Sequence, residues 1–183
     1  MGAGPYTVTF LEMTAPPRRA PPPQPFVPGG GSLALLRAER PPVHFFLYLY
    51  ATVGAEYEWT DRLREPRDQV AAFVQDPAVE LNVLYHAGSP AGFYQLDFRE
   101  AGVCDLAYFG LMPEAVGLKL GPWLLGTAIH DAWSPPESTP GRTAAPIEKL
   151  TVNTCTLDHP AALPLYQRMG FNPVRREEHV RSE

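Results

Sequence analysis

The residues best suited to chemistry lie at 116–121, VGLKLG, and are followed at once by Pro122 and a helical pattern. Gly117 and Gly121 suit a tight turn, and a proline is well tolerated in the first turn of a helix. Such a turn directs backbone N–H groups and the positive end of the helix at one place. The pattern therefore predicts an anion-binding turn, to which Lys119 could add a positive charge.

A second segment, residues 158–171 (DHPAALPLYQRMGF), places Tyr166 within a short helical pattern. Gly170 is the residue type expected just after the end of a helix. Pro164 conflicts with a helix over 160–169, because a proline past the first turn removes a helical hydrogen bond. We therefore expect a late start of this helix or a local distortion at the proline.

Together the two segments resemble the central motifs of the GNAT superfamily of N-acetyltransferases, which bind acetyl-coenzyme A. The first is similar to the turn Q/R-x-x-G-x-G/A, which holds the pyrophosphate of coenzyme A; Gly121 fits it, whereas Val116 and Lys119 depart from it. The second is similar to the ending N-x-x-A-x-x-L/F-Y-x-x-x-G-F. Its matched positions are Ala162, Leu165, Tyr166, Gly170 and Phe171. The resemblance extends over residues 33–180.

For the coenzyme, the resemblance implies a cradle of backbone N–H groups at the turn. Because Pro122 has no N–H, the expected donors are Leu118, Lys119, Leu120 and Gly121, with Gly117 shaping the turn. The Lys119 side chain could crowd the phosphates or could compensate for the missing glycine as a point charge.

Residues beyond the turn complete the expected coenzyme site. The resemblance implies that a backbone N–H before the turn stabilises the developing oxyanion, and the candidate donors are Phe109, Gly110 and Leu111. Asn153 is a candidate contact to the pantetheine arm or the substrate. His159 stands where the family has Asn, and it either caps the helix or contacts the pantetheine arm.

Two side chains are candidates for proton transfer. By position, Tyr166 inherits the role of the general acid that protonates the departing thiolate; the alternative is a core aromatic with a hydrogen-bonded hydroxyl. Asp105 is the sole carboxylate of the strand expected over 103–111 and is a candidate general base. The alternative for Asp105 is a solvated residue at a strand start. Cys104 and Cys155 lie in apolar runs and are expected to be buried thiols.

The region that covers the acceptor in GNAT folds is here residues 47–65, LYLYATVGAEYEWTDRLRE. As a cluster, its aromatic residues could form a wall and its acids could attract an amine. Taken singly, each aromatic is expected to be a core residue and each acid to be solvated. The aromatics are Tyr48, Tyr50, Tyr57 and Trp59, and the acids are Glu56, Glu58 and Asp61.

The predicted elements follow the GNAT order of strand, two helices, three strands, helix, strand, helix and strand. In chain order we expect strands at 33–39, 79–85, 91–99, 103–111 and 150–156, and helices at 42–57, 66–74, 122–133 and 160–169. The three central strands should form an antiparallel meander, because their connections are too short for crossovers. Residues 134–146, SPPESTPGRTAAP, are expected to be a proline-rich surface loop.

The N-terminal part lies outside the resemblance. Residues 6–13 read as an extra strand, which could form a long-looped hairpin with the strand at 33–39. Between them lies a surface loop, 14–31, with seven prolines between Pro16 and Pro28. After the last helix only residues 172–183 remain, room for one strand where a GNAT protein has two. The sheet edge is then completed either by the N-terminal strand or by a partner subunit.

Composition fits a single compact domain over residues 1–183, and the resemblance implies an α/β fold with a mixed, mostly antiparallel sheet flanked by about four helices. The 183 residues are 45% hydrophobic and carry a net charge of −5, which argues against a nucleic-acid partner. No stretch is long enough to span a membrane, and two cysteines form no disulfide framework. We expect a cytoplasmic monomer or homodimer, and no metal at the site.

These features lead to the hypothesis of an acetyl-coenzyme A-dependent N-acetyltransferase that acts on a small primary amine. One alternative is a GNAT-fold sensor or regulatory module that binds an acyl-coenzyme A but transfers little. The other is an interaction protein that uses the proline-rich loop.

Overall fold

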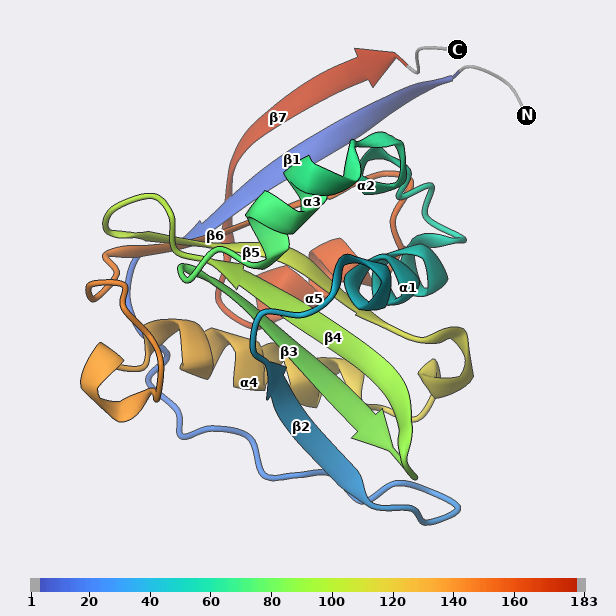
Figure 1. The fold of residues 1–183 in the computed structure, drawn as a ribbon. Helices are drawn as coiled ribbons and strands as arrows, with labels where there is room; N and C mark the ends of the chain where they lie inside the picture. The colour runs from blue at the N-terminus through green and yellow to red at the C-terminus, as the bar shows by residue number, and fades with distance from the viewer. Residues whose placement is uncertain (1–3, 181–183) are drawn as a thin grey trace.

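The sheet is the framework of the molecule. The computed structural model describes residues 4–180, which form a seven-stranded sheet in the order β2-β3-β4-β5-β6-β1-β7 (Figure 1). The strands are β1 (Pro5–Met13), β2 (Leu33–Ala38), β3 (Val79–His86), β4 (Ser89–Asp97), β5 (Val103–Leu111), β6 (Lys149–Cys155) and β7 (Asn172–Val180). All neighbouring pairs are antiparallel except β5 and β6. The predicted mixed, mostly antiparallel sheet is confirmed.

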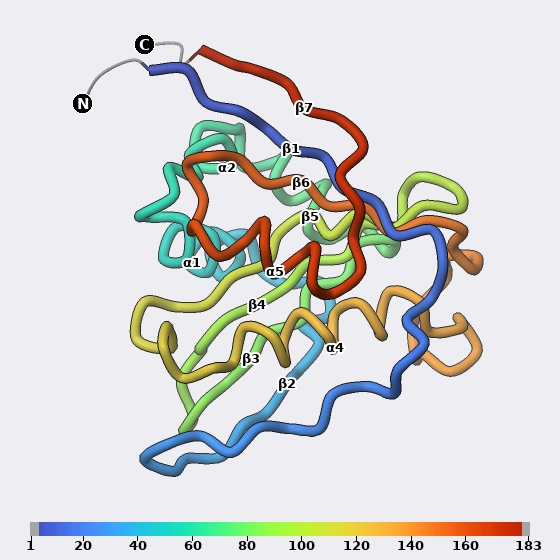
Figure 2. The backbone as a smooth tube through the Cα atoms, turned by 180° about the vertical axis from the view of Figure 1, so that it is seen from behind, coloured from blue at the N-terminus to red at the C-terminus, as the bar shows by residue number. Residues whose placement is uncertain are grey.

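Helices cover both faces of the sheet. They are α1 (Val43–Gly54), α2 (Asp61–Arg64), α3 (Arg67–Val74), α4 (Gly121–Trp133) and α5 (Ala162–Arg168), with short 3-10 turns η1 (Pro113–Ala115) and η2 (Pro136–Ser138). Figure 1 shows α1 to α3 in front of the sheet, and Figure 2, from behind, shows α4 and α5 on the other face. Two hydrophobic clusters fill the layers, one on each face. Among residues 4–180, no helix is both long and apolar enough to cross a membrane.

Strands β5 and β6 separate soon after they meet. Their parallel pairing is confined to three pairs, from Val103 with Lys149 to Asp105 with Thr151. On its other edge β5 carries an irregularity, because Leu106 pairs with Leu96 and Tyr108 with Gln95, which leaves Ala107 without an opposite residue. Such a bulge bends a strand and increases its twist. The divergence opens the sheet beyond Asp105, and the candidate site lies there.

The N-terminal strand completes the sheet, as one of the two expected alternatives proposed. β1 lies between β6 and β7 and pairs antiparallel with both; residues 181–183 of the expected last strand lie outside the described residues. The expected hairpin between β1 and β2 is wrong, because the two strands lie on opposite halves of the sheet. The loop that joins them passes over α4, where Pro22 packs so closely that a Cβ on Gly126 would lie 2.8 Å from its Cγ.

The first helix ends earlier than expected, at Gly54, so that Tyr57 belongs to the following turn. The chain folds back there, since the Trp59 N–H donates to the Gly54 carbonyl over 3.2 Å. A Cβ on Gly54 would lie 2.3 Å from the Cβ of Trp59, so this return requires glycine. The short helix α2, which follows, has too few residues to show a periodic pattern and was not predicted.

The last helix confirms the expectation raised by its proline. α5 begins at Ala162, so Pro164 falls in the first turn, where a missing N–H costs no helical hydrogen bond. Gly170 follows the helix with a φ of 107°, the left-handed conformation expected there.

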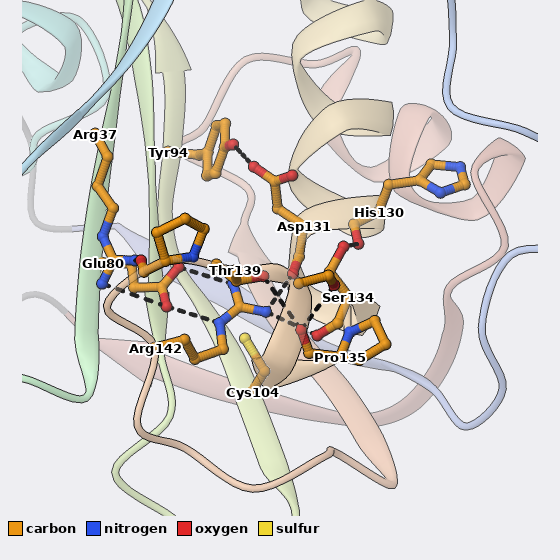
Figure 3. A network of polar contacts seen from close by, with 12 residues as sticks. Arg37, Glu80, Tyr94, Cys104, His130, Asp131, Ser134, Pro135, Thr139 and Arg142 are labelled. Carbon is orange, nitrogen blue, oxygen red and sulfur yellow. Dashed lines mark hydrogen bonds and ion pairs between the residues drawn. The ribbon is translucent and has the colours of Figure 1, made fainter.

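The loop between α4 and β6 is more than a surface connection, because it carries a buried arginine (Figure 3). The Arg142 guanidinium donates to both carboxylate oxygens of Glu80, over 2.7 and 2.8 Å, and to the carbonyls of Asp131 and Ser134 at the end of α4. Arg37 adds a second cation 3.5 Å from Glu80. The expected surface loop at 134–146 is confirmed by its exposed and half-buried residues, with Arg142 as the buried exception, and this clamp fixes α4 against β3.

Candidate functional site

A cleft of about 1020 Å³ lies where β5 and β6 diverge. Its walls come from these two strands, the connection between α1 and α2, the turn before α4, and α5. Tyr6 and Val8 of β1 close one side. Because strands of a sheet normally pair along their length, this opening exposes backbone groups that a continuous ladder would occupy.

The turn at one end of the cleft has the shape of an anion site. Lys119, which stands where the GNAT pattern has glycine, adopts a φ of 60°, and Gly117 has a φ of 89°. The left-handed conformation that favours glycine is therefore kept at Lys119, at a cost of about 1 kcal/mol. Within residues 4–180, the N–H groups of Gly117, Lys119, Leu120 and Gly121 have no hydrogen-bond partner. These four residues line the cleft at the N-terminus of α4.

Leu118 is the exception among the expected donors. Its N–H donates to the Ala115 carbonyl over 3.2 Å, and its side chain packs against the core beneath the turn. The expectation for Leu118 is thus corrected, because η1 winds this peptide inward. The Lys119 side chain is exposed, and its residue lines the cleft.

Tyr166 lies in the wall of the same cleft. It is 6% exposed, and its ring meets those of Phe109 and Phe171 edge to face. Burial, followed by the nearby Asp158 and Asp105 charges, raises the pKa of Tyr166. No described residue hydrogen-bonds its hydroxyl. The hydroxyl therefore remains protonated at neutral pH and is available to a ligand, which distinguishes it from a core tyrosine with a fixed partner.

Asp105 lies at the point where the two strands part. The Thr151 hydroxyl donates to its carboxylate over 2.7 Å across the last β5–β6 pair. Burial raises the pKa of Asp105, the Thr151 hydrogen bond opposes this, and Asp97 and Glu100 add to it. Asp105 is thus a half-buried carboxylate in the cleft wall rather than a solvated residue at a strand start. A raised pKa suits a group that must accept a proton near neutral pH.

The three candidate oxyanion donors on β5 face different ways. The Met112 N–H donates to the Ala91 carbonyl of the neighbouring strand end over 2.9 Å. Hydrogen-bonded pairs alternate along an antiparallel ladder, so the N–H of Gly110 is directed at β4. The N–H groups of Phe109 and Leu111 then face the side vacated by β6. This narrows the expected donors to Phe109 and Leu111.

Gly110 has a packing role instead. A Cβ there would lie 2.3 Å from Cγ1 of Val53 on α1, so only glycine lets this helix approach β5.

His159 and Asn153 take separate places on the cleft. The Nδ1 atom of His159 accepts from the Ala161 N–H over 3.1 Å, which orders the loop before α5, while α5 itself has no side-chain cap. Its ring also meets that of Tyr57, with centroids 6.2 Å apart. Asn153 is exposed on β6 and lines the cleft without a described hydrogen-bond partner.

Asp158 is a residue of the site that the sequence did not reveal. Its carboxylate accepts from the Thr154 hydroxyl over 2.7 Å, from the Cys155 N–H over 2.8 Å, and from Nε1 of Trp59 over 3.3 Å. The one feature of the sequence that could have indicated Asp158 is its position before a helix start, where Asp is a favoured residue. Asp158 connects the loop before α5 with the connection between α1 and α2.

The acceptor end of the cleft combines aromatic and charged groups. Of the predicted aromatic wall, Tyr50, Tyr57 and Trp59 line the cleft, whereas Tyr48 is 51% exposed and does not. Of the acids, Glu58 and Asp61 line it and Glu56 does not.

Arg62 also belongs to this end of the cleft and was missed. Its Nε donates to the Tyr108 hydroxyl over 2.9 Å, its Nη1 donates to Glu65 over 2.8 Å, and its guanidinium lies 4.0 Å from the Phe73 ring centroid.

Cys104 is buried as expected, and burial raises the pKa of its thiol. Cys155 is only half-buried, at the edge of the cleft.

Neither a protein-family model nor a curated protein matches the sequence. Solved structures do match the fold. A tandem GNAT protein of the clavulanic acid biosynthesis pathway matches with a TM-score of 0.58 and 16% identity, over 98% of this chain and 54% of that one. A GCN5-related N-acetyltransferase from Kribbella flavida matches with a TM-score of 0.56 and 16% identity, over 91% of this chain and 54% of that one.

The chain has the GNAT fold. An aminoglycoside acetyltransferase from an uncultured soil metagenomic sample, in complex with trehalose, shares it with a TM-score of 0.56 and 13% identity, over 75% of this chain and 87% of that one. The chain spans about half the length of the first two structures. Another structure that matches, a conserved protein from Staphylococcus epidermidis, is of unknown function, so the fold alone does not assign an activity.

Proposed function

We propose that the chain is an N-acetyltransferase that moves an acetyl group from acetyl-coenzyme A to a primary amine of a small molecule. The observation that carries this proposal is the divergence of β5 and β6. It brings three functional parts into one cleft: the four unpaired N–H groups of the turn, the hydroxyl of Tyr166, and the carboxylate of Asp105.

The residues present fit coenzyme A. Its pyrophosphate needs several donors at one place, and the N–H groups of Gly117, Lys119, Leu120 and Gly121 supply them beside a helix N-terminus. Lys119 adds a mobile positive charge at the rim. The pantetheine arm would pass along the open edges of β5 and β6, where Asn153 offers an amide to it.

The protein groups then divide the proton transfers between them. Asp105 accepts a proton from the acceptor ammonium, directly or through a water, which leaves a neutral amine. The amine nitrogen attacks the thioester carbonyl carbon, and the N–H of Phe109 or Leu111 stabilises the oxyanion that forms. When the carbon–sulfur bond breaks, the Tyr166 hydroxyl gives its proton to the thiolate. The nitrogen of the new amide loses its extra proton, which returns to the Tyr166 oxygen through solvent, and Asp105 releases to solvent the proton that it took from the ammonium.

The acceptor would lie at the end of the cleft that faces α1 to α3. Tyr50, Trp59 and Phe73 supply apolar surface there, and Asp61 and Asp105 supply negative charge for an amine. This combination favours a small amine with an apolar portion. We also propose that the transfer is direct, within a ternary complex, since burial raises the pKa of the Cys104 and Cys155 thiols and leaves neither prepared to carry an acyl group.

Release of free thiol from acetyl-coenzyme A across a panel of small amines tests this proposal. We expect amine-dependent thiol release that depends on the Tyr166 hydroxyl, together with a mass increase of one acetyl group on the acceptor. Binding of acetyl-coenzyme A without thiol release for any amine would overturn the transferase and favour the sensor alternative. Absence of binding at millimolar concentration would overturn the coenzyme assignment as well.

A further inference from the structure

Trp59 bridges the two strands that part to form the cleft. On the β5 side, its Cη2 atom would lie 3.9 Å from a Cβ on Gly110, and its ring centroid is 5.5 Å from that of Tyr108. On the β6 side, its Nε1 donates to Asp158, which lies just after the strand, over 3.3 Å. The indole therefore spans the opening from one edge to the other.

Both the backbone and the side chain of Trp59 are held in place. The Trp59 backbone folds onto the end of α1, where its N–H donates to the Gly54 carbonyl and its Cβ fills the space that a Cβ of Gly54 would need. The indole then packs against Tyr50, with ring centroids 5.5 Å apart. Asp158 is itself fixed by the Thr154 hydroxyl and the Cys155 N–H. A large side chain anchored this way is a fixed wall rather than a mobile surface residue.

In the arrangement proposed above, this wall would lie beyond the transferred group. An acyl group carried between the open strand edges would have its carbonyl oxygen near the N–H of Phe109 or Leu111, and its alkyl end would point toward the indole. The space next to Gly110 on the α1 side is closed as well, because Val53 lies 2.3 Å from a Cβ built there. Room for a longer alkyl chain would require displacement of Trp59.

We propose that Trp59 sets the length of the acyl group, so that the chain accepts acetyl and excludes longer acyl-coenzyme A donors. This inference rests on the proposed function, whose coenzyme it further specifies. Trp59 acts by steric exclusion and takes no part in proton transfer. One methylene in a closed apolar pocket is worth roughly ten- to two-hundred-fold in discrimination. We expect a penalty of this size for each methylene beyond acetyl in the wild-type protein.

The test compares binding and turnover for coenzyme A, acetyl-, propionyl-, butyryl- and hexanoyl-coenzyme A in four proteins. These are the wild type, Trp59→Ala, Trp59→Phe, and Tyr48→Ala as a matched control. Tyr48 is an aromatic residue of α1 outside the cleft. Affinities come from calorimetric titration, which needs no acceptor amine, and turnover comes from thiol release.

We expect Trp59→Ala to bind free coenzyme A as the wild type does, and to bind butyryl- and hexanoyl-coenzyme A at least ten-fold more tightly than the wild type. Trp59→Phe should extend the accepted length by one or two methylenes, and Tyr48→Ala should keep the wild-type preference. If Trp59→Ala still binds acetyl-coenzyme A but keeps the wild-type preference for acyl length, the inference is overturned. Failure of the wild type to bind any of the five compounds would instead overturn the proposed function. If Trp59→Ala does not fold, the Trp59→Phe series decides the matter.

Discussion

Replacement of Tyr166 by phenylalanine separates the catalytic interpretation from the structural one by the sign of a stability change. The ring is packed between Phe109 and Phe171 and keeps these contacts in the variant. The hydroxyl has no hydrogen-bond partner among the described residues, although the residue is 6% exposed. Its removal therefore breaks no bond that holds the fold together.

The magnitudes follow from these contacts. A buried hydroxyl without a partner costs about 1 to 3 kcal/mol in proteins, and contact with water in the cleft reduces this cost. We expect the free energy of unfolding of Tyr166→Phe to be unchanged or raised by up to about 1 kcal/mol. Loss of a general acid lowers turnover by on the order of a hundred- to ten-thousand-fold. The affinity of the variant for the coenzyme should remain within about two-fold of the wild-type value, because the substitution leaves the cradle at 116–121 unchanged.

The assay combines urea unfolding, calorimetric titration of acetyl-coenzyme A, and thiol release with the best amine. Since burial raises the pKa of Tyr166, its proton stays in place and the wild-type rate should show no decline assignable to it up to about pH 9. A variant that loses about 1 kcal/mol of stability and keeps its turnover would show that Tyr166 is a structural residue. The proton for the thiolate would then have to come from solvent.

Three further changes follow from the site and the fold. Lys119→Gly should raise the free energy of unfolding by about 1 kcal/mol, because glycine relieves the left-handed φ of 60°. It should weaken coenzyme binding only mildly, whereas Lys119→Glu should weaken it strongly. Tighter binding by Lys119→Gly in calorimetry would mean that the side chain obstructs the site. Burial raises the Asp105 pKa above its ordinary value of 3.8, so its contribution to stability is complete below that value and is lost as the pH rises through the folded pKa. Asp105→Asn should thus be more stable than the wild type at pH 7 but not at pH 3, with a reduced rate at neutral pH; equal stability differences at both pH values in urea unfolding would refute the buried carboxylate. Arg142→Ala should cost about 3 kcal/mol in the same assay, because it strands the carboxylate of Glu80 with only Arg37 nearby, and a loss below 1 kcal/mol would contradict the clamp.

Much of the fold could be predicted because its signals are local. The short connection between the strands expected at 79–85 and 91–99 predicted an antiparallel pair, which the structure forms through a hairpin whose Ala87 and Gly88 adopt positive φ values of 49° and 86°. The conflict at Pro164 was resolved by a late helix start, as helix geometry requires. The pairing of β1 was not determined by the sequence, because a strand pattern gives the buried face and not the neighbour. The loop at 14–31 is long enough to reach either side of the sheet.

For the site, too, features set by nearby residues could be predicted from the sequence, and contacts between distant segments could not. The turn at 116–121, Tyr166 and Asp105 could be predicted to lie near one another, because the resemblance places them on known elements, and the structure puts all three on one cleft. Leu118 was expected wrongly as a donor, because the inward winding of η1 depends on how the whole turn packs. The role of the Asp158 carboxylate could be recognised only in the folded structure, because its hydrogen bond with Trp59 joins residues 99 positions apart in the sequence.

The most direct test of the account is the response of individual amide signals to acetyl-coenzyme A in a nitrogen–proton correlation spectrum. The signals of Gly117, Lys119, Leu120 and Gly121 should shift most, because their N–H groups are unpaired and these residues line the cleft where the pyrophosphate is proposed to bind. The Leu118 signal should shift far less, because its N–H is already bonded to the Ala115 carbonyl. Uniform shifts across the turn, shifts confined to another surface, or no change at saturating ligand would contradict the assignment of this cleft as an acyl-coenzyme A site.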